Sequence, residues 1–137
     1  MGNKGFTLIE LLLSIALLTL ISIIIAPEVF KLMKQNEVNA CNSTLSSIMK
    51  ASSLYVKENK YDLGITCSNN TKKVSLKTLY DYDYLTGKVE GDPDNGGYFK
   101  NPVEGKDPFY LSDEVTITYN CDTLKFTYSY KEDNYCE

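Results

Sequence analysis

The sequence contains no histidine, no arginine and no closely spaced pair of cysteines. Histidine is the most frequent general base, so its absence argues against acid–base or nucleophilic catalysis. Structural zinc sites usually contain closely spaced cysteine or histidine pairs, so the cysteine spacing also argues against bound zinc. The net charge of −4 gives no general basic footprint for nucleic acid and leaves a local contact open. We therefore expect neither an enzyme nor a cofactor.

The sequence has one long apolar run, at residues 6–26, in which Glu10 is the only ionisable side chain. A helix needs about 20 apolar residues to cross a bilayer core, and this run is long enough. A cleaved secretory signal has a shorter apolar core, and a plain signal anchor leaves Glu10 unexplained. A carboxylate in a membrane helix is costly and is functional by default, although the helix dipole alone would also favour it near an N-terminus. The run predicts a single membrane helix in which Glu10 needs a partner.

Residues 4–10, KGFTLIE, resemble the processing site of type IV pilins and their pseudopilin relatives. In that family a membrane-embedded prepilin peptidase cuts after the glycine of a short basic leader, a class III signal, and methylates the new N-terminus. The resemblance implies a leader at 1–5, cleavage between Gly5 and Phe6, and N-methylation of Phe6. It extends over the family's N-terminal helix to about Tyr55. The absence of arginine and the many asparagines favour a low-GC bacterium.

The cleavage implied by this resemblance gives Glu10 a partner. It creates an α-amine on Phe6, and in a bundle of identical subunits this amine can pair with Glu10 of a neighbour. Either charge left alone in an apolar filament core would be strongly unfavourable, so Phe6 and Glu10 are the expected assembly residues. In the family a proline at the place of Pro27 bends the long helix, so Pro27 is the expected kink. A simple helix break at the membrane boundary is the alternative.

The rest of the chain predicts an amphipathic helix and a small sheet. Residues 28–58 carry apolar side chains at steps of three and four, which is the helical period. Residues 114–130 form two alternating runs joined at 120–123, which predicts a β-hairpin. We expect an α+β fold in which the long N-terminal helix packs on a small antiparallel sheet, the pilin architecture. The apolar stripe of the helix comprises Val38, Cys41, Leu45, Ile48, Ser52 and Tyr55.

The segment between this helix and the hairpin gives weaker signals. Residues 59–73 read as a polar connection, and 74–85 as a short helix entered at Ser75 and followed by an extended piece. Residues 90–108 contain too many glycines and prolines for a helix. A short strand is expected to begin at residues 98–99.

These signals divide the chain into four parts. The expected parts are the leader (1–5), the transmembrane and polymerisation helix (6–27), the amphipathic half of the long helix (28–58) and a small globular head (59–137). A head of this size makes a marginal hydrophobic core, so the even number of cysteines is expected to form stabilising disulfides.

The pairing of Cys41, Cys67, Cys121 and Cys136 cannot be read from the sequence, because four cysteines allow three connectivities. The pilin family often closes a C-terminal loop with a disulfide, which here would be Cys121–Cys136. The strand between them makes this reach tight, since it carries the chain away from the turn. The resemblance therefore favours Cys121–Cys136 together with Cys41–Cys67.

For two further patterns, an acidic turn and the many tyrosines, we favour a structural role over a binding role. Asp92, Asp94 and Asn95 are the candidates for a calcium loop. However, Gly96 stands at the third ligand position of the EF-hand template, and a tight turn explains the same residues. We therefore favour no metal. The many tyrosines are expected to pack as half-buried aromatics, with an adhesive role as the less favoured reading.

Our leading interpretation is a structural subunit of a type IV pilus. It would span the cytoplasmic membrane once and then polymerise into an extracellular filament at the cell surface. The implied partners are the prepilin peptidase, other pilin subunits, the membrane, and a pilus assembly platform that supplies ATP hydrolysis. One alternative is a pseudopilin of a type II secretion or DNA-uptake (competence) system. The other is a membrane-anchored extracellular binding module that does not polymerise.

Overall fold

The computed structural model describes residues 5–131 and 135–137. The first four residues of the expected leader lie outside the described residues. The chain divides into two compact units, Met1–Asn36 and Glu37–Glu137, which we describe one at a time.

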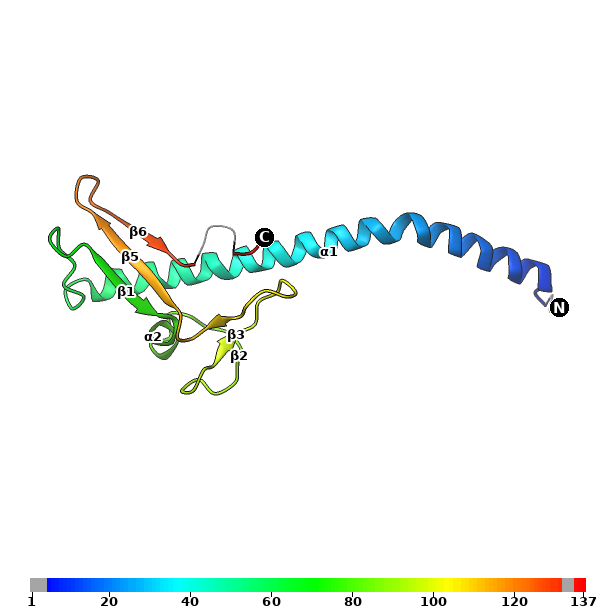
Figure 1. Cartoon of the computed structure of the whole chain (residues 1–137). Coiled ribbons are helices and arrows are strands. Elements are labelled where there is room, and N and C mark those ends of the chain that lie inside the picture. The colour runs from blue at the N-terminus through cyan, green and yellow to red at the C-terminus, as the bar shows by residue number, and fades with distance from the viewer. Residues whose placement is uncertain (1–4, 132–134) are drawn as a thin grey trace. The chain divides into compact units, whose positions relative to one another are not determined.

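A single helix, α1, runs from Leu8 to Asn59 and belongs to both units (Figure 1). This confirms the long N-terminal helix. Pro27 lies inside α1, so the alternative of a helix break at that residue is wrong. A proline has no N–H, and the carbonyl of Ile23 therefore lacks its usual helical partner.

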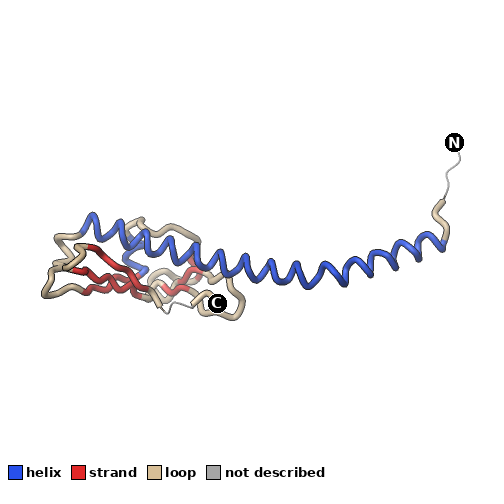
Figure 2. The backbone as a smooth tube through the Cα atoms, turned by 90° about the horizontal axis from the view of Figure 1, so that it is seen from above, coloured by secondary structure: helices blue, strands red, loops and turns tan. Residues whose placement is uncertain are grey.

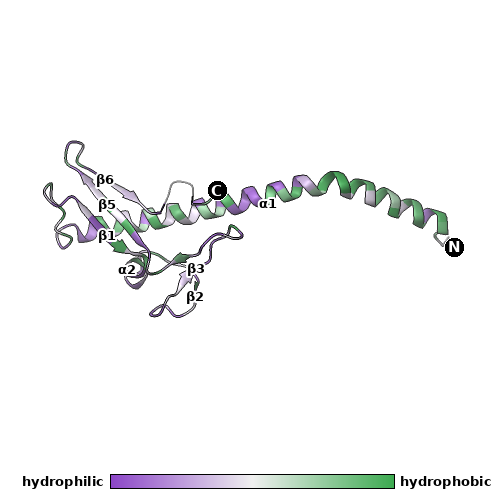
Figure 3. Cartoon of the chain, in the orientation of Figure 1, coloured by the Kyte–Doolittle hydropathy of each residue, from purple (hydrophilic) through white to green (hydrophobic). Residues whose placement is uncertain are grey.

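The first unit consists of the N-terminal part of α1 and the short segment before it. Every described side chain of residues 5–36 is exposed. The helix is almost continuously hydrophobic up to Pro27 (Figure 3), and it is long and apolar enough to cross a membrane. Such a surface is unfavourable in water and suits a lipid bilayer or the interior of an assembly.

The second unit packs the C-terminal part of α1 against an antiparallel sheet (Figure 2). This sheet has the order β1 (Thr71–Ser75), β5 (Glu114–Asn120) and β6 (Lys125–Ser129). Val115 and Ile117 of β5 are fully buried and belong to the same core as the α1 stripe, which confirms the expected helix-on-sheet packing. The residues of α1 buried in this core are Cys41, Ile48, Ala51, Ser52 and Val56.

The expected hairpin is confirmed as β5 and β6, but its turn extends one residue further than predicted. Leu124 lies in the turn with φ at 54° and is 70% exposed. Asn120 holds the turn because its side-chain carbonyl accepts hydrogen bonds from the backbone N–H groups of Asp122 and Thr123, at 3.0 and 2.9 Å.

Strand β1 corrects the prediction of a polar connection over residues 59–73. The strand pairs along its whole length with β5, in the register Thr71↔Thr118 to Ser75↔Glu114. It lies at the edge of the sheet, and Val74 is the one buried side chain of the strand. An edge strand of mostly polar residues lacks the apolar alternation by which a strand is recognised in a sequence.

The short helix α2, Leu76–Asp81, begins where the sequence predicted, with Ser75 as its N-cap. The Ser75 hydroxyl accepts a hydrogen bond from the N–H of Thr78 at 3.1 Å. The extended piece expected after it is wrong, because residues 82–85 form turns. The N–H groups of Tyr84 and Leu85 both donate to the carbonyl of Leu79 at 2.9 Å and fold the chain back over the helix end.

A second small antiparallel sheet has the order β2 (Val89–Glu90), β3 (Tyr98–Phe99) and β4 (Phe109–Tyr110). The strand expected at 98–99 is therefore confirmed. Directly opposed residues lie on the same face of a sheet. One face carries the cross-strand row Val89, Phe99 and Phe109, which packs into the core.

The two disulfides are Cys41–Cys136 and Cys67–Cys121, with Cα–Cα distances of 5.7 and 5.9 Å. The favoured pairing of Cys121 with Cys136 and of Cys41 with Cys67 is therefore wrong. Cys121 lies at the hairpin turn, beside the loop that leads into β1, and Cys67 is in that loop. Strand β6 carries the chain away from the turn, so the C-terminus reaches α1 instead of Cys121 (Figure 1).

Candidate functional site

The N-terminus of α1 carries a reciprocal hydrogen-bond pattern between Thr7 and Glu10. Glu10 Oε2 accepts hydrogen bonds from the backbone N–H of Thr7 at 2.9 Å and from its hydroxyl at 2.8 Å. The N–H of Glu10 donates back to the Thr7 hydroxyl oxygen at 3.4 Å. This is a capping box, in which the two side chains satisfy N–H groups that the first helical turn leaves without partners. The carboxylate is thereby fixed at the positive end of the helix dipole.

The capped carboxylate faces an open hollow of about 420 Å³ lined by Gly5, Phe6, Thr7 and Glu10. The expected cleavage bond, Gly5–Phe6, borders the same hollow, and the Phe6 side chain is 85% exposed. A Cβ atom added at Gly5 would have no neighbour within 4 Å. A larger side chain at residue 5 would therefore cause no clash within this chain. A substitution there tests recognition by a protease without disturbing the fold.

The structure thus brings Gly5, Phe6 and Glu10 together and places Pro27 separately, within α1. Thr7 also belongs to this site, and our reading of the sequence missed it. The signal was present, because a threonine followed three residues later by a glutamate at the start of an apolar run is the capping-box pattern.

The hydroxyl groups in the apolar part of α1 bond to the helix itself. The hydroxyl of Ser14 donates to the carbonyl of Glu10 at 2.6 Å, that of Thr19 donates to Ala16 at 2.8 Å, and that of Ser22 donates to Leu18 at 2.8 Å. Bonds of this kind let a hydroxyl enter an apolar medium without an unsatisfied donor. Glu10 is the one ionisable side chain of this run, so it is the group whose charge is costly in an apolar medium.

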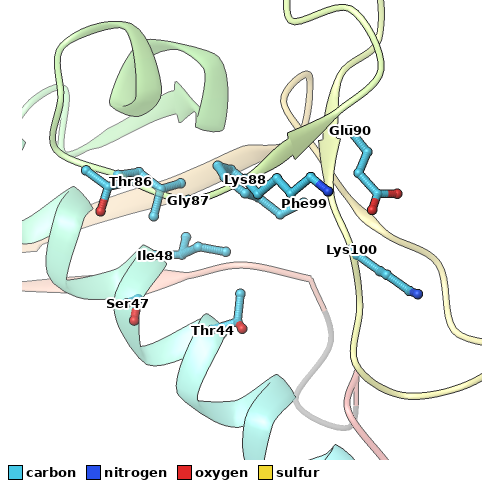
Figure 4. A pocket seen from close by; sticks show the side chains of 10 residues that line it. Thr44, Ser47, Ile48, Thr86, Gly87, Lys88, Glu90, Phe99 and Lys100 are labelled. Carbon is cyan, nitrogen blue, oxygen red and sulfur yellow. The ribbon is translucent and has the colours of Figure 1, made fainter.

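A second hollow, of about 320 Å³, lies in the head between α1 and the segment that leads into β2 (Figure 4). Gly87 allows this segment to lie close to Phe99, because a Cβ atom at residue 87 would be 3.0 Å from the ring. The residues that line the hollow offer hydroxyls, two lysines and one carboxylate but no nucleophile with an adjacent base. They are Thr44, Ser47, Ile48, Leu85, Thr86, Gly87, Lys88, Glu90, Phe99 and Lys100.

The calcium candidates form a hydrogen-bonded turn. Asp92 accepts hydrogen bonds from the N–H of Asp94 at 3.0 Å and from the side-chain amide of Asn95 at 2.9 Å, and these bonds lower the pKa of the Asp92 carboxyl. Asp94 forms an ion pair with Lys77 at 2.8 Å. Within the described parts of the chain, no group of three or more histidine, cysteine or acidic residues is placed to hold a metal ion.

One ionic cluster joins the end of β6 to the loop before β5. Asp113 Oδ2 accepts a hydrogen bond from the Tyr130 hydroxyl at 2.7 Å and forms an ion pair with Lys131 at 3.0 Å. Burial, and then the bond to Asp113, raises the pKa of Tyr130 far above its usual value. Burial lowers the pKa of Lys131, but its bonds to Tyr135 and Asp113 outweigh this effect and leave the pKa raised. Tyr130 is the buried member of this cluster, whereas the ion pair between Asp113 and Lys131 is partly exposed to solvent. The hydrogen bond from Tyr130 to Asp113 is expected to stabilise the head.

Residues 1–26 match the family described as the prokaryotic N-terminal methylation motif. Among curated proteins and solved structures, nothing matches the chain. The motif implies processing by a prepilin peptidase and assembly with pilin subunits into filaments, and it indicates a structural protein in preference to an enzyme. The apolar start of α1, which lies within the matched residues, fits membrane anchoring. The chain therefore carries the class III signal of type IV pilins and pseudopilins, which supports a type IV pilin-like or pseudopilin protein.

Proposed function

We propose that the chain is a structural subunit of a type IV pilus, cleaved after Gly5, methylated on Phe6 and polymerised through its N-terminal helix. One observation supports this proposal above the others: Glu10 is a fixed, exposed carboxylate in an otherwise uncharged membrane-length run. Its position beside the Gly5–Phe6 bond links the charge to the processing step. A plain membrane anchor has no use for either feature.

The chemistry of assembly follows from cleavage. Hydrolysis of the Gly5–Phe6 bond leaves a cationic amine on Phe6, in the same hollow as the Glu10 carboxylate. In a bundle of subunits, the amine of one chain pairs with Glu10 of its neighbour, and the pair removes two lone charges from an apolar interior. A subunit out of register leaves both charges unpaired, so the pair selects the docking position.

The remaining parts take roles that fit their surfaces. The uncharged part of α1 holds the processed monomer in the cytoplasmic membrane until an assembly platform adds it to the filament. The head is then carried on the outside of the filament at the cell surface. A pseudopilin of a type II secretion or DNA-uptake system is the second candidate, because it shares the matched motif. The mass of filament released by shearing cells separates a long pilus from a short pseudopilus.

The proposal is tested first by the intact mass and N-terminal sequence of the membrane-extracted protein. We expect a chain that begins at Phe6 and carries one added methyl group. In Gly5→Leu we expect no cleavage, because the enlarged side chain stands at the scissile bond while the chain itself tolerates it. Gly2→Leu is the matched control and should be processed normally. A wild-type chain that keeps MGNKG, or a Gly5→Leu chain that starts at Phe6, refutes the assignment.

A further inference from the structure

The outward face of the sheet β2-β3-β4 carries aromatic and charged side chains. The register Glu90↔Tyr98↔Tyr110 places these three side chains in one cross-strand row, opposite to the row that enters the core. Tyr110 is 39% exposed, and the side chains of Glu90 and Tyr98 are half-buried. The outward face therefore consists of two phenol rings beside a carboxylate.

The loop at residues 101–108 forms the wall of a groove on this face. The groove has a volume of about 410 Å³ and includes the row Glu90, Tyr98 and Tyr110 together with Lys100, Glu104 and Lys106. This volume falls in the range of small-molecule sites.

The wall is held in place by hydrogen bonds, two of them made by one buried asparagine. Asn101 is 6% exposed, and its side-chain amide donates to the carbonyl of Asp107 at 3.0 Å while its oxygen accepts from the N–H of Val103 at 3.0 Å. The Tyr135 hydroxyl also donates to the carbonyl of Asp107. A loop fixed at both ends by its own hydrogen bonds is a preformed wall, which lowers the entropic cost of binding.

The two tyrosine rings form a corner and not a platform. Their centroids are 6.0 Å apart, and their planes meet at 66°. Successive nucleic-acid bases stack on flat aromatic surfaces in a positively charged groove. Here the groove carries two lysines and two glutamates, so its formal charge is balanced, and the corner can seat one ring-shaped group at a time.

We propose that this groove binds a short neutral oligosaccharide. The carbon-bound hydrogens of a pyranose pack on an aromatic face, whose charge is negative, while its hydroxyls need both donors and acceptors around the rim. Glu90 and Glu104 supply acceptors, Lys100 and Lys106 supply donors, and the tyrosine hydroxyls supply both. The balanced charge matches a polyhydroxylated ligand with no net charge, and the open groove predicts weak binding by a single subunit. The inference does not depend on polymerisation.

The test uses the full-length chain in a polyoxyethylene detergent, because maltoside micelles would themselves present sugar. Saturation-transfer NMR and calorimetry are run with tri-N-acetylchitotriose, cellotriose and maltotriose, and with a short oligothymidylate as the anionic comparison. We expect at least one neutral trisaccharide to bind with a millimolar or lower Kd. Absence of binding by all three at millimolar concentration overturns the proposal. Stronger binding of the oligothymidylate than of every trisaccharide also overturns it.

The variants locate the binding. Tyr98→Ala and Tyr110→Ala should each weaken binding of the trisaccharide by about tenfold or more. Glu90→Gln keeps the shape of the groove and should weaken binding of the trisaccharide less than the tyrosine variants do. This variant still tests the groove if a tyrosine variant fails to fold. Tyr82→Ala removes a ring that is 68% exposed outside the groove, and it should leave binding unchanged. Equal affinity in wild type, Tyr98→Ala and Glu90→Gln, or an equal loss in Tyr82→Ala, rejects this groove as the site.

Discussion

The two units of the chain differ in how much of their apolar surface each buries within itself. In the first, every described side chain of residues 5–36 is exposed, and most of that surface is apolar (Figure 3). In the second, α1 and both sheets share one buried core, and no buried side-chain polar atom among the described residues lacks a hydrogen-bond partner. The first unit is thus incomplete without lipid or other subunits, whereas the second has the features of a self-sufficient fold.

This difference separates assembly from stability. Glu10, the one ionisable side chain of the apolar run, is in the first unit, and the two disulfides and the ionic cluster around Asp113 are in the second. A change in the first unit should therefore alter filament formation and leave unfolding of the head unchanged. A change in the second should do the reverse, provided that the head still folds.

The largest effect is expected for Glu10→Ala. The variant should still be inserted and cleaved, but its sheared filament should fall by at least about tenfold, because in the proposed pairing it leaves the Phe6 amine of each neighbour alone in an apolar interior. Quantitative immunoblotting of sheared and cell-bound fractions measures this. Glu10→Gln is the control for shape and should fail equally. A wild-type amount of sheared filament from either variant would show that the Glu10 charge is not required for assembly.

In the second unit, the largest effect is expected from loss of the Cys41–Cys136 bond. Replacing both cysteines with alanine should lower the free energy of unfolding of the head by about 4 kcal/mol, because the bond joins residues 95 apart and restricts the unfolded chain. Urea unfolding monitored by tyrosine fluorescence gives the value. The matched comparison is Cys67→Ala with Cys121→Ala, which removes the bond of sequence separation 54. A loss below about 1 kcal/mol for both pairs would contradict the view of the head as a disulfide-supported fold.

A smaller effect in the second unit should appear only at high pH. The pKa of Tyr130 is raised in the folded head, and an unfolded tyrosine titrates near pH 10. Above about pH 10 the unfolded chain loses this proton while the folded chain keeps it. The contribution of Tyr130 to the free energy of unfolding is therefore complete below about pH 10 and decreases as the pH rises further. The slope should be about 1.4 kcal/mol per pH unit for this one proton.

Tyr130→Phe isolates this contribution. Its stability should be lower than that of the wild type at pH 8, because the hydroxyl bond to Asp113 is lost, and it should fall less steeply between pH 10 and 11. Urea midpoints across this pH range provide the test. Equal slopes for wild type and variant would show that the Tyr130 hydroxyl does not control the alkaline loss.

The sequence predicted those features that depend on local periodicity. The continuous helix, its apolar stripe and the β5-β6 hairpin each repeat at the period of their own backbone, so one chain was enough to identify them. The processing motif was identifiable because its residues are adjacent in the sequence. Ser75 was likewise placed correctly as a helix start, since a cap acts within one turn.

The sequence did not predict features that depend on distant partners. Strand β1 has a single buried side chain, and its pairing with β5 defines it more than its own composition does. The disulfide pairing depends on the direction in which β6 leaves the hairpin turn. The C-terminal disulfide loop that is frequent in the pilin family does not determine this direction. Both errors arose where tertiary contacts decide the outcome.

The smallest expected effect, and the finest test of the comparison, is in the first unit at Thr7. Thr7→Val keeps the shape of the side chain but removes the hydroxyl that bonds to Glu10 Oε2 at 2.8 Å. Loss of one capping contact should make amide hydrogen exchange in the first turn of α1 about fivefold faster and leave exchange in the head unchanged. Thr7→Ser retains the hydroxyl and should behave as the wild type. If Thr7→Ser accelerates exchange as much as Thr7→Val, the hydroxyl does not fix the carboxylate, and Glu10 meets its partner without prior orientation.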